Sequence, residues 1–398
     1  EKPMLKNISI VTPVLAILTL ASLILSACTG MQAATPTLTA TLPPTAIPIP
    51  TVTPIPLPSL SLVPGEFYFH LDDQPSFIFS RNLDANQEYY YGPFLEWSSD
   101  GGSRIVRVLL SVLGAGFTVN GDVDEVWARQ WERIFDRAEM EGIYILPILN
   151  GQDLWDTTNP EMGWLSNPFN AANGGPTQNP LDLYQAGSET QELWLGWVEK
   201  LVERWHGRTN ILAWEILGEV NCSPAAEADG IALLNRAASR IRVIDPGRLL
   251  TASRCESGTW PDLYAQADID FVQVHPYPVT GQLDRNILYL VRQVLTTYQL
   301  PVMIGESGLH FVRPDFEEGK ITVAENAERG VRHAIWAGIV SGAMNGRALW
   351  WEDSVGIYFQ ELGMPWLEQY STMELPAVHF TEGVDFTGFA PITASSSP

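Results

Sequence analysis

Strand-like and helix-like stretches alternate along most of this 398-residue chain, and this alternation is the feature that most restricts its fold. Eight short apolar runs have the composition of buried strands: Phe77–Asn82, Arg104–Ser111, Ile143–Leu149, Ile211–Glu219, Leu249–Ser253, Phe271–Tyr277, Val302–Glu306 and Ala348–Trp351. Apolar residues recur at helical spacing between them, as in Val123–Glu141, Glu189–Trp205, Ala226–Ile244, Leu283–Tyr298 and Thr322–Val340. Eight strands alternating with helices predict a single (β/α)8 TIM barrel.

A doubly wound α/β sheet is the main alternative for such an alternation. That fold usually carries a glycine-rich turn that binds phosphate, yet no GxGxxG or GxxxxGK[ST] motif follows any of the strand-like runs. A hairpin-like start, Phe67–His70 and Ser76–Ser80, precedes the alternating region. The barrel is therefore the favoured architecture.

The charge of the chain limits its partners. A formal net charge of −23 repels nucleic acid and anionic membrane surfaces at long range, so neither is an expected partner, whereas a neutral ligand is unaffected. The six histidines show neither an HExxH motif nor another paired-ligand spacing. We therefore expect no catalytic metal and no cofactor, and we expect a monomer.

The first 28 residues resemble a bacterial lipoprotein signal. Lys2 and Lys6 precede an apolar run that ends in Leu25-Ser-Ala-Cys28, and a basic start, an apolar core and small residues before a cysteine suit export and lipid attachment to Cys28. A transmembrane anchor is the alternative. We expect an exported protein, lipid-anchored to the bacterial cell surface or extracellular, whose membrane contact is through this lipid only.

Composition divides the remainder of the chain into three parts. Residues 29–64 are rich in threonine and proline, which favours an extended, semi-rigid linker. Residues 65–375 hold the predicted barrel, and residues 376–398 are expected to be a C-terminal extension or a linker. Cys222 and Cys255 follow the fourth and fifth strands. The sequence allows either a disulfide between them or two free thiols.

Two strand-like runs end in glutamate, and this pairing indicates the chemistry. Glu219 ends the fourth run and Glu306 ends the seventh, and the carboxyl ends of barrel strands form active sites. Retaining hydrolysis of a glycosidic bond needs one carboxylic acid to protonate the leaving oxygen and one carboxylate, about 5 to 5.5 Å away, to attack the anomeric carbon. We therefore identify Glu219 and Glu306 as candidate catalytic residues.

Neighbouring side chains suit the same chemistry. Arg107, on the second strand, can keep a nearby carboxylate ionised, and His275 and Tyr277, on the sixth, can hydrogen-bond to the two glutamates. Trp351, at the end of the eighth strand, offers an aromatic face for a sugar ring. Glu215 lies deeper in the fourth strand, and we expect it to pair with a buried cation such as Arg107 rather than to react.

These residues resemble the motifs of clan A glycoside hydrolases, in particular the cellulases and mannanases of family 5. Trp214–Asn221 (WEILGEVN) is similar to the family's WExxNE motif, Ile304–Gly308 (IGESG) to its nucleophile motif, and His275–Tyr277 to its sixth-strand motif. The resemblance covers about residues 67–370. It implies that Glu219 is the acid/base and Glu306 the nucleophile of a retaining β-glycosidase acting on a β-linked glucan or mannan.

One position departs from the family pattern. Gly218 stands where the family has an asparagine that contacts the sugar 2-hydroxyl, and Asn150, at the end of the third strand, is a possible substitute. A non-catalytic glycan-binding lipoprotein with a degenerate cleft is therefore the alternative function. Among enzymes, an exo-acting glycosidase is the alternative, because the insertion from Trp155 to Tyr184 could close one end of the cleft.

Overall fold

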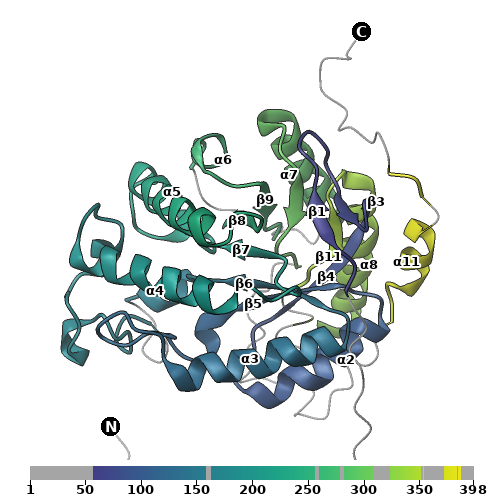
Figure 1. The fold of residues 1–398 in the computed structure, drawn as a ribbon. Helices are drawn as coiled ribbons and strands as arrows, with labels where there is room; N and C mark the ends of the chain where they lie inside the picture. Colours follow the sequence, from purple (N-terminus) through teal and green to yellow (C-terminus); the bar gives the residue numbers. More distant parts are fainter. Residues whose placement is uncertain are drawn as a thin grey trace, which may run out of the picture. The chain divides into compact units, whose positions relative to one another are not determined.

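The computed structural model describes residues 57–157, 163–255, 260–277, 282–308, 323–350, 353, 372–382 and 384–386. Within them, eight parallel strands form one sheet in the order β10-β9-β8-β7-β6-β5-β4-β11 (Figure 1). Their bounds are β4 Ile78–Leu83, β5 Ile105–Leu109, β6 Tyr144–Ile148, β7 Ala213–Glu215, β8 Leu249–Arg254, β9 Phe271–Val274, β10 Val302–Ile304 and β11 Asn345–Arg347.

The two ends of the eight-stranded sheet meet and close it into a barrel. The backbone N–H of Met344 donates to the carbonyl of Val302 at 2.8 Å, and Ser307 and Leu349 form a parallel bridge beyond the ends of β10 and β11. The amide nitrogen of Asn345 donates to the carbonyl of Ile304 at 2.8 Å. The prediction of a (β/α)8 barrel is therefore confirmed.

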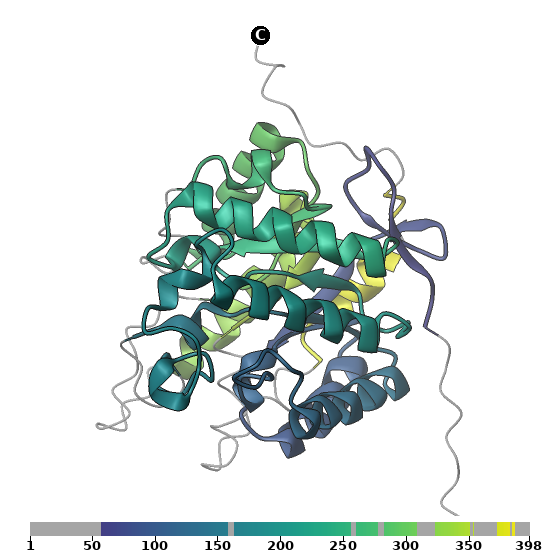
Figure 2. The same cartoon turned by 60° about the vertical axis from the view of Figure 1, so that its left-hand side comes forward.

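Helices follow the strands and cover the outside of the barrel. They are α2 Tyr91–Asp100, α3 Glu125–Met140, α4 Glu189–Trp205, α5 Glu227–Ile244, α6 Leu263–Gln266, α7 Leu283–Tyr298, α8 Val323–Ser341 and α11 Leu375–Glu382. Side-chain caps fix the first residues of α3 and α4. The Asp124 side chain accepts hydrogen bonds from two first-turn N–H groups of α3, and the Ser188 side chain accepts one from α4. Figure 2 shows α4 and α5 side by side in front of the strands.

A separate three-stranded antiparallel sheet closes the N-terminal end of the barrel. It consists of β1 Leu60–Leu62, β2 Phe69–Leu71 and β3 Gln74–Ser76, with Asp72 and Asp73 in the hairpin turn at positive φ. Phe69 packs edge-on against Phe271 and joins the apolar cluster formed by the first inward-facing residues of the barrel strands. Because apolar side chains fill this end of the barrel, a polar site has room only at the C-terminal ends of the strands.

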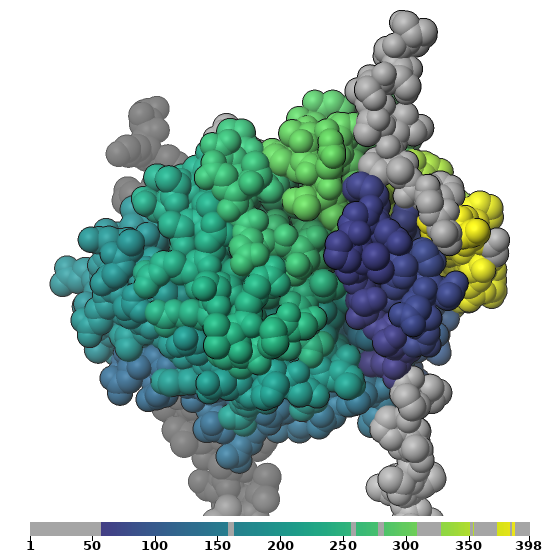
Figure 3. Space-filling model, turned by 45° about the horizontal axis from the view of Figure 1, so that its top comes forward, coloured from purple at the N-terminus to yellow at the C-terminus, as the bar shows by residue number. Residues whose placement is uncertain are grey.

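Residues beyond the predicted boundaries also pack onto the barrel. β1 lies within the segment 29–64 assigned as a linker, and α11 begins at the last residue of the predicted barrel and continues into the segment 376–398 assigned as an extension. Phe386 packs on Tyr68 with ring centroids 4.9 Å apart, and Figure 3 shows the N-terminal strands beside the last described residues. The packed part of the chain therefore extends at least from β1 to Phe386.

A buried ionic cluster attaches the C-terminal segment to the first and last strands. Glu374 accepts hydrogen bonds from Arg81 on β4, at 2.6 Å, and from Arg347 on β11, and Arg347 also pairs with Asp353 at 2.8 Å. All four side chains are almost completely buried. Two arginines balanced by two carboxylates leave no net charge in the interior, as buried ionic groups require.

Several strands end earlier than the sequence pattern predicts: β9 ends at Val274 and β10 at Ile304, so Tyr277 and Glu306 lie beyond their strands. The eighth strand is Asn345–Arg347 rather than Ala348–Trp351, because Arg347 and Ala348 both adopt positive φ, which breaks extended pairing at the place where a strand was expected. The fourth strand ends at Glu215, so Glu219 lies four residues beyond it. Apolar composition cannot distinguish a strand from a buried segment that follows it.

The predicted signal segment (1–28) with Cys28, and most of the linker, lie outside the described residues. Among the described residues, no helix combines the length and the apolar character that crossing a bilayer requires.

Candidate active site

Because strand residues alternate between two faces, polar side chains point into the barrel interior near the C-terminal ends of the strands. In β5, Ile105 faces the apolar cluster at the bottom of the barrel, and Arg107, two residues later on the same face, lies above it. In β7, Ala213 and Glu215 repeat this relation. Arg107 and Glu215 therefore meet in the interior, just below the C-terminal ends of the strands.

Arg107 connects two glutamates. Its Nε and Nη2 donate to the carboxylate of Glu215 at 2.7 and 2.8 Å, and its Nη1 donates to Glu306 Oε1 at 2.6 Å. Burial alone would lower the pKa of Arg107, but the negative charges of Glu215 and Glu306 outweigh burial and raise it. The predicted pairing of Glu215 with Arg107 is confirmed, and the guanidinium holds a fixed positive charge against Glu306.

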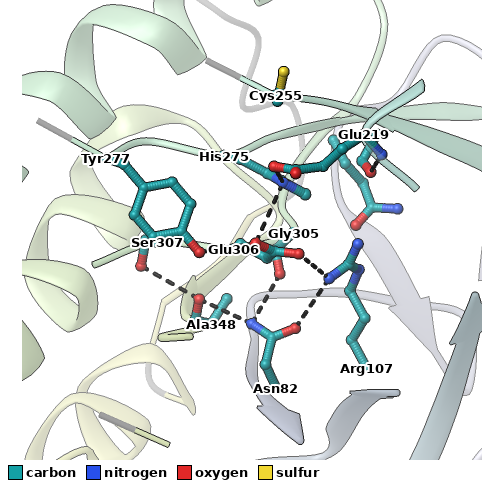
Figure 4. Close-up of polar contacts among 12 residues, drawn as sticks. Asn82, Arg107, Glu219, Cys255, His275, Tyr277, Gly305, Glu306, Ser307 and Ala348 are labelled. Carbon is teal, nitrogen blue, oxygen red and sulfur yellow. Dashed lines mark hydrogen bonds and ion pairs between the residues drawn. The ribbon is translucent and has the colours of Figure 1, made fainter. Parts of the chain in front are cut away.

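The Glu306 carboxylate contacts Arg107, Tyr277 and, at 3.5 Å, His275 Nδ1, and the backbone before it is held as well. Besides the Arg107 contact, the Tyr277 hydroxyl donates to Glu306 Oε2 at 2.8 Å, and Asn82 Nδ2 donates to the backbone carbonyl of Gly305 at 3.0 Å (Figure 4). Burial raises the pKa of Tyr277 well above its usual value, and the charge of Glu306 adds to this effect. Tyr277 therefore keeps its proton and remains a donor to the carboxylate.

Glu219 has a different environment. Its Oε1 lies 2.8 Å from His275 Nδ1, its Oε2 accepts from Gln152 Nε2 at 3.0 Å, and its backbone N–H donates to the Ser253 hydroxyl at 2.8 Å. Burial would raise the pKa of Glu219, but the hydrogen bond and charge of His275, together with Arg107, hold it below its usual value.

The backbone at Glu219 is unusual and helps to aim the side chain. Its φ of 47° and ψ of 41° lie in the left-handed region, which costs a residue other than glycine about 1 to 2 kcal/mol. The carbonyl of Glu219 accepts the N–H of Cys222 at 2.8 Å, which starts a turn of 3-10 helix at Val220–Cys222. Hydrogen bonds on both sides of the residue thus compensate for an unfavourable conformation.

The two glutamates form one acidic pair. One oxygen of each carboxylate and one ring nitrogen of His275 all lie within 4.8 Å of one another, and Figure 4 shows the three side chains pointing toward a common space. Three such groups could ligate a metal ion. However, His275 Nε2 is buried with no acceptor among the described residues, whereas a metal-bound histidine normally donates its other N–H to one. Arg107 already neutralises Glu306, so the arrangement suits acid–base chemistry better.

Two of the predicted site residues lie elsewhere or cannot be assessed. The side-chain oxygen of Asn150 accepts the indole N–H of Trp155 at 2.7 Å, so this oxygen does not contact the glutamates. The backbone carbonyl of Asn150 accepts the N–H of Gly218 at 2.9 Å. Trp351 lies outside the described residues. The structure brings the other five predicted residues together around the acidic pair: Arg107, Glu219, His275, Tyr277 and Glu306.

Sequence reasoning missed three residues that position the pair. Asn82 and Ser253 are the polar last residues of two predicted strands, a signal that could have identified both. Gln152, which donates to Glu219, comes from a loop and has no such signal. At Gly218, a Cβ atom would lie 3.0 Å from Ile148 Cγ2, so the absence of a side chain there also relieves crowding.

A disulfide and a side-chain clip tie the loop after Glu219 to the next strand. Cys222 and Cys255 are bonded, with Cα atoms 6.1 Å apart, which resolves the alternatives that the sequence left open. Asn221 Oδ1 accepts the N–H of Cys255 at 2.8 Å, and Asn221 Nδ2 donates to the carbonyl of Cys255 at 3.2 Å. The loop that carries the left-handed Glu219 is therefore attached on its C-terminal side.

Asp84, just beyond β4, is the most perturbed carboxyl group near the pair. Burial, then the charges of Asp153 and Glu306, raise its pKa from 3.8 to about 7, although Arg107 opposes this. Because the folded protein holds this proton more tightly than the unfolded chain, the group costs no stability below about pH 4. Stability is lost as the pH rises from about 4 to about 7.

We therefore expect Asp84→Asn to stabilise the protein at pH 8 and to leave its stability nearly unchanged at pH 4. The expected gain in the free energy of unfolding at pH 8 is about 2 kcal/mol. This is roughly half of the free energy that the whole pKa shift would give, because the side chain is partly exposed. Urea unfolding at the two pH values measures it, with the exposed Asp100→Asn as a control. An equal effect of Asp84→Asn at both pH values would contradict the assignment.

Comparison with known proteins places this fold among glycosidase structures. No protein-family model matches the chain, and no curated protein matches its sequence. A β-mannanase from the blue mussel Mytilus edulis superposes with a TM-score of 0.55, at 13% identity over 83% of this chain and 98% of the mussel protein. An exo-β-1,4-mannosidase from Opitutaceae bacterium strain TAV5 gives 0.59, at 15% identity over 81% and 63% of the two chains.

A glycoside hydrolase family 5 mannosidase from Rhizomucor miehei is also similar, with a TM-score of 0.57 at 12% identity over 73% of this chain and 85% of the fungal chain. At such low identities these likenesses establish the TIM-barrel fold.

Proposed function

We propose that this chain is a retaining β-glycosidase that hydrolyses O-glycosidic bonds of a β-linked glucan or mannan, with Glu306 as nucleophile and Glu219 as acid/base. One observation carries the proposal: the two carboxylates have oxygens within 4.8 Å of each other and differ in their shortest contacts, although His275 Nδ1 also lies 3.5 Å from Glu306 Oε2. Arg107 contacts Glu306 at 2.6 Å, and His275 contacts Glu219 at 2.8 Å. Two carboxyl groups at close range with different environments are what a double displacement requires.

The first chemical step follows from these contacts. Glu306, held by the Arg107 guanidinium, attacks the anomeric carbon of the bound sugar while the bond to the leaving oxygen breaks. The carboxylic acid form of Glu219 gives its proton to that oxygen, so the leaving group departs as an alcohol. The sugar is then an ester of Glu306, and Glu219 is an anion.

The second step reverses the roles. Glu219, now a carboxylate, removes a proton from water, and the water oxygen attacks the anomeric carbon as the bond to Glu306 breaks. The Tyr277 hydroxyl, which donates to Glu306 Oε2 at 2.8 Å, stabilises the departing carboxylate. Two inversions at one carbon give net retention, with both glutamates restored.

The sugar is proposed from the comparisons. The mussel, bacterial and fungal proteins that share the fold are a β-mannanase and two mannosidases, which supports a mannan-type substrate for this chain. A panel of mannans, manno-oligosaccharides and β-glucans, assayed by release of reducing ends, tests both the activity and the sugar. We expect release from at least one member. The proposal would be contradicted if no member of the panel released reducing ends. It would also be contradicted if the double variant Glu219→Gln/Glu306→Gln released as much as the wild type.

A non-catalytic glycan-binding protein is the second candidate, and Gly218 is the observation that favours it. The family motif has an asparagine there, and the side-chain oxygen of Asn150, the substitute expected from the sequence, accepts the indole N–H of Trp155 instead. The same panel separates the two functions, since a binding protein would retain the polysaccharide in affinity electrophoresis without releasing reducing ends.

Export and lipid attachment through Cys28 remain part of the proposal. The bonded Cys222 and Cys255 support export, because structural disulfides persist in oxidising compartments. Metabolic labelling with a radioactive fatty acid in a bacterial host tests the anchor. Label should enter the wild-type chain and be lost in Cys28→Ala, and equal labelling of both chains would contradict lipid attachment at this residue.

The disulfide should matter for both stability and catalysis. We expect Cys222→Ser/Cys255→Ser to lower the free energy of unfolding by about 2 to 4 kcal/mol, because the bridge closes a loop across a sequence separation of 33. Since the bridge holds the loop that carries Glu219, kcat/KM should fall more for an unactivated disaccharide than for a dinitrophenyl glycoside, whose leaving group needs no proton. Equal losses on the two substrates would show that the bridge does not position the acid.

A further inference from the structure

A left-handed turn ends β11 close to Glu306. Arg347 and Ala348, which form the turn, have φ angles of 70° and 47°. Neither residue is glycine, and a side chain with a Cβ atom makes this conformation unfavourable. Two such residues in succession therefore need fixed contacts around them. The hydrogen bonds of the turn lead in two directions, inward to Glu306 and outward to the C-terminal segment.

The residue after Glu306 is bonded to this turn. Ser307 Oγ donates to the carbonyl of Arg347 at 3.0 Å and also lies 3.3 Å from the carbonyl of Ala348. The carbonyl of Ser307 accepts the N–H of Trp350 at 2.8 Å. Because Ser307 is completely buried, water does not compete for these bonds. The backbone on the C-terminal side of Glu306 is thus held by the turn and by the residues just after it.

The residue before Glu306 is bonded to the same turn through Asn82. The side-chain amide of Asn82 donates to the carbonyl of Gly305 at 3.0 Å and to the carbonyl of Ala348 at 3.1 Å. Figure 4 shows these bonds as one line that runs from Ser307 through Ala348 to Asn82 and Gly305. A displacement of the Ala348 carbonyl would therefore loosen the backbone on both sides of Glu306.

The buried ionic cluster holds the turn from outside the barrel. The side chain of Arg347 pairs with Glu374 and, at 2.8 Å, with Asp353. Glu374 also accepts from Arg81 at 2.6 Å and from Ser103 at 2.7 Å. Burial would raise the pKa of Glu374, but the charges of Arg347 and Arg81 lower it, so the carboxylate stays ionised. Arg347 cannot leave the cluster without stranding a buried charge.

We propose that Glu374 is a positioning residue for the nucleophile: through Arg347 it holds the left-handed turn to which the backbone on both sides of Glu306 is bonded. The proposal rests on the proposed function, because Glu306 is a nucleophile only if the chain is a retaining glycosidase. Glu374 acts through Arg347 and not on the sugar, so it governs the orientation of attack rather than the affinity for substrate. A segment that follows the barrel strands in sequence thereby sets the geometry of the reaction.

The first set of variants changes the cluster. Glu374→Gln keeps the size of the side chain and removes its charge, and Glu374→Asp keeps the charge but shortens the reach to Arg347, so it is the milder change. Ile241→Ala is the control for a general loss of stability, because Ile241 is completely buried on α5, outside the cluster.

The second set changes the inner bond and leaves the cluster intact. Ser307→Ala removes the hydroxyl that donates to the turn. Ser98→Ala is its matched control, because the Ser98 hydroxyl is also buried and donates to a backbone carbonyl, within α2, at 2.7 Å.

The first measurement follows attack by Glu306. Dinitrophenyl glycosides of manno- and gluco-oligosaccharides need no proton to release their leaving group, so the rate of the first turnover reports formation of the ester, and its dependence on substrate concentration gives the dissociation constant. We expect Glu374→Gln and Ser307→Ala to lower this rate about tenfold and Glu374→Asp to lower it less. The dissociation constant should change less than about twofold, and both controls should match the wild type.

The second measurement does not depend on activity. Hydrogen exchange followed by mass spectrometry should show faster exchange across residues 302–308 in Glu374→Gln and Ser307→Ala than in their controls. The proposal is overturned if the Glu374 variants keep the wild-type rate and exchange, or if Ile241→Ala shows the same changes. A wild-type protein that releases no dinitrophenolate would refute the proposed function instead, and exchange would still decide whether Glu374 holds the segment that contains Glu306.

Discussion

Glu306→Ala is expected to lower kcat/KM on a β-linked substrate by about 10⁴-fold or more, which corresponds to about 5.4 kcal/mol of transition-state stabilisation. The reason is that Glu306 carries the covalent intermediate, and no other described carboxylate lies in the same position against Arg107 and Tyr277. Added azide should enter the space left by the side chain and attack from that face. The product would be a glycosyl azide of inverted configuration.

Glu219→Ala should behave differently from Glu306→Ala. Loss of a general acid costs about 10²- to 10⁴-fold on an unactivated substrate and much less on a dinitrophenyl glycoside. With such a substrate the ester on Glu306 still forms, and azide then displaces Glu306 to give a β-glycosyl azide of retained configuration. Assay of both variants with azide, with product configuration read by proton NMR, checks the assignment. The same azide product from both variants would contradict it.

Arg107→Met is expected to lower the free energy of unfolding by about 3 to 5 kcal/mol, the second largest effect that we anticipate. The substitution leaves Glu215, which is completely buried, and Glu306, which is mostly buried, without the cation that neutralises them. Activity should fall as well, because Glu306 loses the donor that fixes its carboxylate in place for attack. Urea unfolding at pH 7 measures the stability change.

Two further variants show whether burial is the cause. Arg129→Met removes an exposed arginine whose contact with Glu125 is 3.8 Å long, and it should cost less than about 1 kcal/mol. Arg107→Met/Glu215→Leu removes one of the stranded charges and should recover part of the lost stability. A similar small cost for Arg107→Met and Arg129→Met would mean that the arginine does not hold the interior together.

The parts of the site that sequence could predict follow from strand alternation. The arginine at position 107 points into the interior because it lies on the inward face of β5, two residues after Ile105. The pairing of Glu215 with Arg107 followed from the same register. For these residues, knowing the period and the fold is enough to place the side chain. Glu306 lies two residues beyond β10 and has the alternation of Ile304, which packs with the helices, so alternation alone does not place it.

The remaining features depend on backbone conformations that composition does not encode. The left-handed backbone at Glu219 and the positive φ of Arg347 and Ala348 occur within apolar runs that look like continuous strand. Asn150 was a reasonable candidate by position, but the indole of Trp155, in a loop of unpredictable path, takes its oxygen. Gln152 reaches Glu219 from that same loop, so its role became visible only in three dimensions.

The configuration of the first product tests the central claim most directly. Proton NMR can follow the anomeric signals during the first minutes of hydrolysis of a β-linked oligosaccharide, before the released sugar mutarotates. Double displacement through Glu306 and Glu219 predicts that the β-anomer appears first and the α-anomer grows in later. If the α-anomer appears first, water attacks the sugar directly, and Glu306 is not the nucleophile proposed here.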